Sequence, residues 1–148
     1  MGQQLPRTDV SIIVTPHCSL ISALMLFEPL RAANRISKQS PFVLNFVSID
    51  GLAVIASNGF VIPVTKSLDE LSSTSVVCLV SSYDQPAELK IALYEKLRRY
   101  SRHGAVLCGI DHGVVMLAEA GLIRNRRISV HWEQLGAVQE RWPELDVC

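Results

Sequence analysis

The sequence predicts an α/β fold in which a mainly parallel sheet carries helices on both faces. Segments with strand character alternate with segments of helical periodicity along the chain, and such alternation is typical of parallel sheets. Residues 75–81 (SVVCLVS) form an uninterrupted apolar run, as expected for a strand that is covered on both faces. The chain has 148 residues, 49% of them hydrophobic, which is enough for one domain with a core. We therefore expect a single domain over residues 1–148.

The first strand and helix are predicted near the start of the chain. Residues 9–16 (DVSIIVTP) are a β-branched run that ends in proline, so we expect a strand. Residues 19–36 carry leucine, methionine and alanine at helical spacing, and Ser19 is a suitable N-cap. Pro29 removes an internal hydrogen bond and should kink this helix. That kink would aim the preceding residue, Glu28.

The middle of the chain predicts a second strand, a hairpin and a second helix. Residues 42–49 (FVLNFVSI) have strand character. The runs 52–57 and 60–66 are joined by Asn58-Gly59, and Asn-Gly supplies the positive φ angles that hairpin turns need. After the buried strand described above, residues 86–102 predict a helix with i,i+4 charge pairs on its outer face.

The last third continues the alternation and then stops. Residues 104–110 (GAVLCGI) predict a strand, and a helix is expected over 112–120. Residues 127–131 (RISVH) have strand character, and 132–143 predict a helix that ends at proline. The final residues, 145–148, again have strand character, but nothing follows them to complete the pattern. We expect a fold that is incomplete at its C-terminal end, as in a fragment or a truncated gene product.

Composition argues against several classes of function. Fourteen basic and fourteen acidic side chains give a formal net charge of zero, so no overall field attracts nucleic acid or an anionic membrane. No apolar run approaches the roughly 18 residues of a membrane span, and the start lacks a signal-peptide pattern, so we expect a cytoplasmic protein. The cysteines form no CxxC pair, and Cys78 and Cys108 lie in apolar runs. We expect no disulfide framework, no metal site and no cofactor.

Polar residues follow the predicted strands. Ligands of open α/β sheets bind at the carboxyl ends of the strands, so these residues should share one edge. Glu28 of the kinked helix would add a carboxylate to that edge. The residues that we expect there are His17, Cys18, Ser81, Ser82, Tyr83, Asp111, His112 and His131.

Four segments carry a family resemblance: FEPLRAANR (27–35), ASNGF (56–60), AEAGLI (118–123) and ISVHWEQLGAVQERWPELDV (128–147). Together they resemble the class I glutamine-amidotransferase-like (PfpI-like) domain. The similarity is greatest to the branch that forms the N-terminal sensor of AraC-type transcription regulators. The resemblance implies a flavodoxin-like three-layer sandwich.

The resemblance also gives a meaning to Asp111. In the wider superfamily a cysteine nucleophile occupies the turn from strand to helix, often followed by histidine and glycine, and a glutamate of the first helix points at it. Glu28 matches that glutamate, while Asp111 stands at the cysteine position, followed by His112 and Gly113. A carboxylate is a poor acyl acceptor compared with an activated thiolate. The resemblance therefore implies a non-catalytic sensor with no catalytic residues.

We predict the ligand-sensing and dimerising domain of an AraC-type regulator, which contacts DNA through a helix-turn-helix region absent from this chain. Glu28 and Asp111 would form an anionic wall for a small cationic or zwitterionic nitrogen compound, because a cation relieves the repulsion between two carboxylates. An aromatic ring could face the cation. The expected ligand-binding residues are Glu28, Ser82, Tyr83, Asp111, His112, His131 and Trp132.

Other interpretations stay open. Asp111 could serve solely as a helix N-cap, Glu28 could be a solvated helix residue, and His112 and His131 could be structural histidines. An amidase, hydratase or protease-like hydrolase of the same superfamily would use Glu28 and His112 in catalysis. A structural module without a ligand would have its cavity packed shut.

Overall fold

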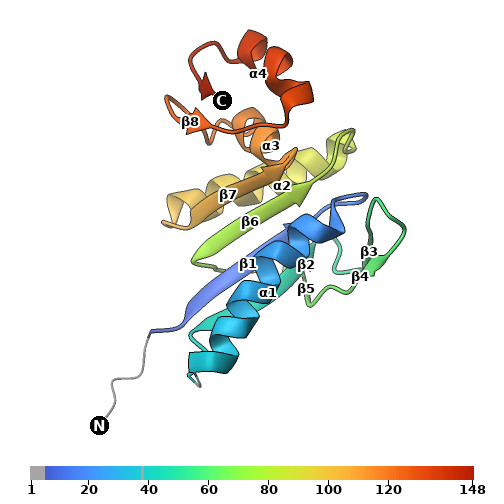
Figure 1. The fold of residues 1–148 in the computed structure, drawn as a ribbon, viewed down its shortest axis with the longest axis vertical. Helices are drawn as coiled ribbons and strands as arrows, with labels where there is room; N and C mark the ends of the chain where they lie inside the picture. Colours follow the sequence, from blue (N-terminus) through green and yellow to red (C-terminus); the bar gives the residue numbers. More distant parts are fainter. Residues whose placement is uncertain (1–5, 38) are drawn as a thin grey trace.

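The computed structural model describes residues 6–37 and 39–148, and its centre is a five-stranded sheet (Figure 1). Every neighbouring pair of strands in this sheet is parallel, which confirms the predicted arrangement. In spatial order the strands are β5 (Lys66–Ser67), β2 (Phe42–Ser48), β1 (Thr8–Val14), β6 (Val76–Ser81) and β7 (Val106–Asp111).

Helices cover both faces of the sheet, as Figure 1 shows. Helix α1 (Leu20–Ser37) packs on the face that carries Ile12 of β1. Helices α2 (Ala87–Arg102) and α3 (Gly113–Glu119) pack on the opposite face, which carries Ile13. Successive residues of β1 thus enter two separate cores, because strand side chains alternate between faces. The predicted three-layer α/β sandwich is confirmed.

Helix α1 begins as the sequence predicts. The backbone N–H of Ser22 donates to Oγ of Ser19 at 3.3 Å, so Ser19 acts as the N-cap. The helix continues through Pro29 without a break. Its outer face exposes apolar side chains, among them Ile21 and Met25.

The predicted hairpin forms in a shorter version. Strands β3 (Val54–Ile55) and β4 (Val61–Ile62) pair antiparallel. Gly59 has a φ of 84°, a positive angle of the kind that the Asn-Gly turn needs. The side chain of Asn58 accepts a hydrogen bond from the backbone N–H of Phe60. The sequence did not predict that β5 leaves the hairpin and joins the main sheet beside β2. A two-residue edge strand is too short to show an alternating pattern.

The C-terminal segment packs on α3. Strands β8 (Arg127–Ile128) and β9 (Asp146–Val147) form a small parallel pair. Between them lie a 3-10 turn (Trp132–Gln134) and helix α4 (Leu135–Arg141), so the single helix predicted over 132–143 is divided. Val138 of α4 packs against residues of α3. Across the described residues, none of the helices has the length and apolarity needed to cross a bilayer.

Candidate functional site

Asp111 occupies a strained turn between β7 and α3. Its φ is 52°, in the left-handed region. This conformation costs a residue other than glycine roughly 1–2 kcal/mol, although aspartate tolerates it better than most. Residues held in such conformations cluster at functional sites. The turn presents the Asp111 side chain outward, and the side chain is exposed.

Two glycines allow this turn to pack tightly. A Cβ atom on Gly109 would lie 2.5 Å from Cα of Val114, and one on Gly113 would lie 2.1 Å from the carbonyl oxygen of Leu79. The segment 109–113 therefore has the form G-x-D-x-G, which is the spacing of a nucleophile elbow. This spacing is visible in the sequence, and it could have identified the elbow without any family resemblance.

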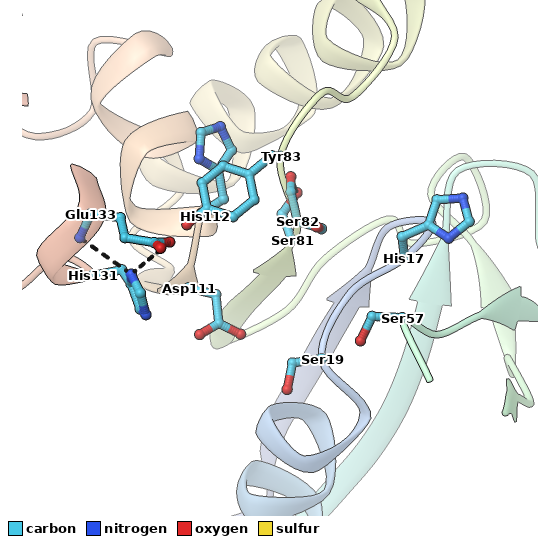
Figure 2. Close-up of a pocket in the computed structure, with 10 residues that line it drawn as sticks. All are labelled: His17, Ser19, Ser57, Ser81, Ser82, Tyr83, Asp111, His112, His131 and Glu133. Atoms are coloured by element: carbon cyan, nitrogen blue, oxygen red, sulfur yellow. Dashed lines mark hydrogen bonds and ion pairs between the residues drawn. The ribbon is translucent and has the colours of Figure 1, made fainter. Parts of the chain in front are cut away.

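A cavity of about 270 Å³ opens beside the elbow (Figure 2). It lies where β1, β6 and β7 end, which is the edge expected for a ligand of a parallel sheet. Figure 2 shows Asp111 between His131 and Glu133 on one side and Ser19 and Ser57 on the other. The lining residues are His17, Ser19, Ser57, Ser81, Ser82, Tyr83, Asp111, His112, His131 and Glu133.

The structure brings together most of the predicted ligand-binding residues. Ser82 and Tyr83 follow β6, Asp111 and His112 form the elbow, and His131 enters from the segment before α4. Trp132 is not among the residues that line the cavity: its side chain is 76% exposed, and its ring lies 5.6 Å from that of His131.

The structure does not bring Glu28 to the cavity, so the match of Glu28 to the family's glutamate is corrected. Glu28 is exposed to solvent and pairs with Arg31 at 2.7 Å, and this hydrogen bond lowers the pKa of Glu28. Ser22 is the α1 residue that reaches the elbow, donating from Oγ to Oδ2 of Asp111 at 2.9 Å. Glu28 lies six positions after Ser22, which places the two side chains about 120° apart around the helix axis.

Glu133 supplies the second carboxylate that the sequence analysis assigned to Glu28. It lines the cavity, and its Oε2 lies 3.5 Å from Nδ1 of His131. The backbone N–H of Glu133 also donates to the same nitrogen at 3.4 Å. Sequence reasoning missed Glu133 because residues 132–143 were predicted as one helix, which hid the 3-10 turn that carries it.

His112 is held in place by neighbours on two sides. Its Nδ1 lies 2.6 Å from Nε2 of the buried Gln134, and its ring lies 5.2 Å from that of Tyr83. Burial lowers the pKa of His112 below its usual value. The imidazole is therefore neutral at pH 7 and adds no positive charge to the cavity.

Thiol chemistry has no support at this site. Cys18 is fully buried, and burial raises its pKa to about 11, which keeps the thiol protonated. No cysteine is among the described residues that line the cavity. Within residues 6–37 and 39–148, no cluster of three or more histidine, cysteine, aspartate or glutamate side chains is arranged to hold a metal ion.

We predict that the protein shows no thiol-dependent hydrolysis of amides or esters, because the elbow presents the Asp111 carboxylate in place of a thiolate. Iodoacetamide should modify the exposed Cys148 and the partly exposed Cys108 without affecting any turnover of a chromogenic ester. Fast labelling of one buried cysteine that abolished turnover in proportion would contradict this prediction.

The parallel sheet, the G-x-D-x-G elbow and the cavity at the strand ends agree with the PfpI-like fold that the sequence analysis predicted. Among solved structures, the chain is similar to an AraC family transcriptional regulator from Pseudomonas putida, with 25% identity and a TM-score of 0.82 over 95% of this chain and 76% of that one. It also has the fold of Drosophila melanogaster DJ-1beta, with 15% identity and a TM-score of 0.73 over 96% of this chain and 74% of that one. No protein-family model matches the chain.

Curated relatives confirm the resemblance to AraC-type regulators. The chain is 36% identical to the HTH-type transcriptional regulator CdhR of Pseudomonas aeruginosa, over 94% of this chain and 41% of CdhR. It is 31% identical to the HTH-type transcriptional regulator GlxA of Rhizobium meliloti, over 93% of this chain and 43% of GlxA. The chain thus has AraC-family regulators as homologues, and it spans less than half the length of these two relatives.

Proposed function

We propose that this chain is the ligand-sensing domain of an AraC-type transcription regulator and that the cavity beside Asp111 binds a small cationic or zwitterionic nitrogen compound. The observation that carries the proposal is the charge of the lining. Two carboxylates, Asp111 and Glu133, line the cavity, whereas no lysine or arginine is among its described lining residues. DNA binding by a whole regulator would reside in a helix-turn-helix region outside residues 1–148.

The surroundings of the two carboxylates favour a cation. A unit charge 4 Å from a carboxylate is attracted by about 4 kcal/mol at an effective dielectric constant of 20, and less in a half-open cavity such as this one. His112 stays neutral and does not oppose that attraction. Tyr83 lines the same cavity, and an aromatic face contributes about 0.5–2 kcal/mol to a cation held over it.

Ligand binding is tested by calorimetry and thermal shift. Arginine, glycine betaine and carnitine are compared with anions of matched size, such as glutarate and phosphate. At least one cationic or zwitterionic compound should raise the melting temperature in a concentration-dependent manner, because a ligand that binds the folded state stabilises it. Stabilisation by the anions and by none of the cations would contradict the proposal.

We also propose that the domain is non-catalytic and pairs as a homodimer through α1. Ile21, Leu24 and Met25 are exposed on this helix, and exposed apolar clusters mark interaction surfaces. A two-fold dimer would bury the same patch on both copies.

We predict a dimer by sedimentation at tens of micromolar, as an order-of-magnitude range. Met25→Lys should shift the protein to a monomer, because two like charges would meet across the two-fold axis. Ile91→Lys is the matched control, since Ile91 is exposed to the same extent on α2 and should leave the dimer intact. A wild-type monomer under these conditions would rule out pairing through α1.

A further inference from the structure

Cys78 and Cys108 face each other across neighbouring strands. They are register partners in the parallel β6–β7 pair, and both belong to the apolar cluster on the α1 side of the sheet. In-register residues of parallel strands lie about 4.8 Å apart, within the range of about 4.4–6.8 Å between the Cα atoms of a disulfide. A disulfide could therefore form with little movement of the backbone.

The two thiols differ in access. Cys78 is buried in the middle of the sheet, whereas Cys108 lies on the edge strand β7 and is partly exposed. Cys108 also lines a hollow of about 470 Å³ that runs along this edge. Burial raises the pKa of the Cys78 thiol, which keeps it protonated. Cys108 is thus the more accessible thiol of the pair, and a small reagent reaches it first.

We propose that Cys78 and Cys108 form a peroxide-oxidisable dithiol, in which Cys108 reacts first and Cys78 resolves it to a disulfide. In the first step the Cys108 thiolate attacks hydrogen peroxide. An S–O bond forms, the O–O bond breaks, and the released hydroxide takes up a proton to become water. Cys108 is oxidised to a sulfenic acid while the peroxide is reduced.

In the second step the Cys78 sulfur attacks the sulfenic sulfur of Cys108. An S–S bond forms, the S–O bond breaks, and the leaving hydroxide departs as water with the proton of the Cys78 thiol. The crosslink would tie β7 to β6 three residues before Asp111, so oxidation would act on the strand that carries the elbow.

The test uses the Cys148→Ser protein, because Cys148 is exposed and would react independently. The reduced protein is treated with hydrogen peroxide, denatured, alkylated and mapped by mass spectrometry. We expect a linked pair of peptides containing Cys78 and Cys108, with Cys18 as the remaining alkylatable thiol. Dithiothreitol should restore both thiols.

Two further variants identify the order of reaction. Cys78→Ala should stop at a sulfenic acid on Cys108 that dimedone traps, whereas Cys108→Ala should leave Cys78 reduced. Circular dichroism checks that both variants fold. The proposal is overturned if peroxide leaves Cys78 and Cys108 alkylatable in the parent protein, or if Cys108 proceeds to a sulfinic acid while Cys78 stays reduced.

Discussion

Replacing Gly113 with alanine is expected to lower the free energy of unfolding by about 3 kcal/mol, the upper end for overpacking a rigid site. The new Cβ would lie 2.1 Å from the carbonyl oxygen of Leu79, which is backbone in the interior strand β6 and cannot move aside without disturbing the sheet. For a domain of this size the loss corresponds to a fall in melting temperature of roughly 6–12 °C. Thermal and urea unfolding measure both quantities.

Gly136→Ala is the matched control, because Gly136 is a helical glycine of α4 with no atom within 4 Å of its ideal Cβ position. Here alanine gains helix propensity without a clash, so stability should stay unchanged or rise by up to about 1 kcal/mol. If Gly113→Ala were as stable as Gly136→Ala, the close approach of α3 to β6 would not be what fixes the elbow.

The order of elements and the parallel sheet could be predicted because their signals are local and long. Residues 76–80 are all apolar, and they form most of the buried strand β6. The residues that follow the strands could be placed at one edge for the same reason, since parallel strands all end on the same side. Ser82, Tyr83, Asp111, His112 and His131 accordingly line one cavity.

The rest of the site depends on geometry that the pattern does not contain. Glu28 was assigned to the elbow from a family match, but a position on a helix must be correct to within one residue to predict a direction. Ser22 reaches Asp111 instead. Gln134 contacts His112 across 22 positions of sequence, and no local pattern indicates such a contact. Predicting that Glu133 lines the cavity would have required knowing where the 3-10 turn begins. Helix boundaries are the least certain part of a sequence-based prediction.

The role of Asp111 is tested most directly by Asp111→Asn. Asparagine tolerates the left-handed conformation at φ 52°, and its amide oxygen can still accept the hydrogen bond from Ser22, so the elbow should keep its shape. The substitution removes the negative charge alone. We expect the affinity for a cationic ligand to fall at least about tenfold, which is about 1.4 kcal/mol. Glu133→Gln should weaken binding in the same direction, because Glu133 lines the same cavity.

Glu28→Gln is the control that distinguishes the effect of the cavity's charge on cation affinity from the effect of the whole protein's net charge. It also removes one negative charge, but Glu28 is exposed and paired with Arg31 away from the cavity lining, so cation affinity should stay as in the wild type. Calorimetry on the three variants at two salt concentrations measures these affinities, and the Asp111 effect should shrink at high salt. If Asp111→Asn binds a cation as tightly as the wild type does, then Asp111 serves to shape the start of α3, and the cation is held elsewhere.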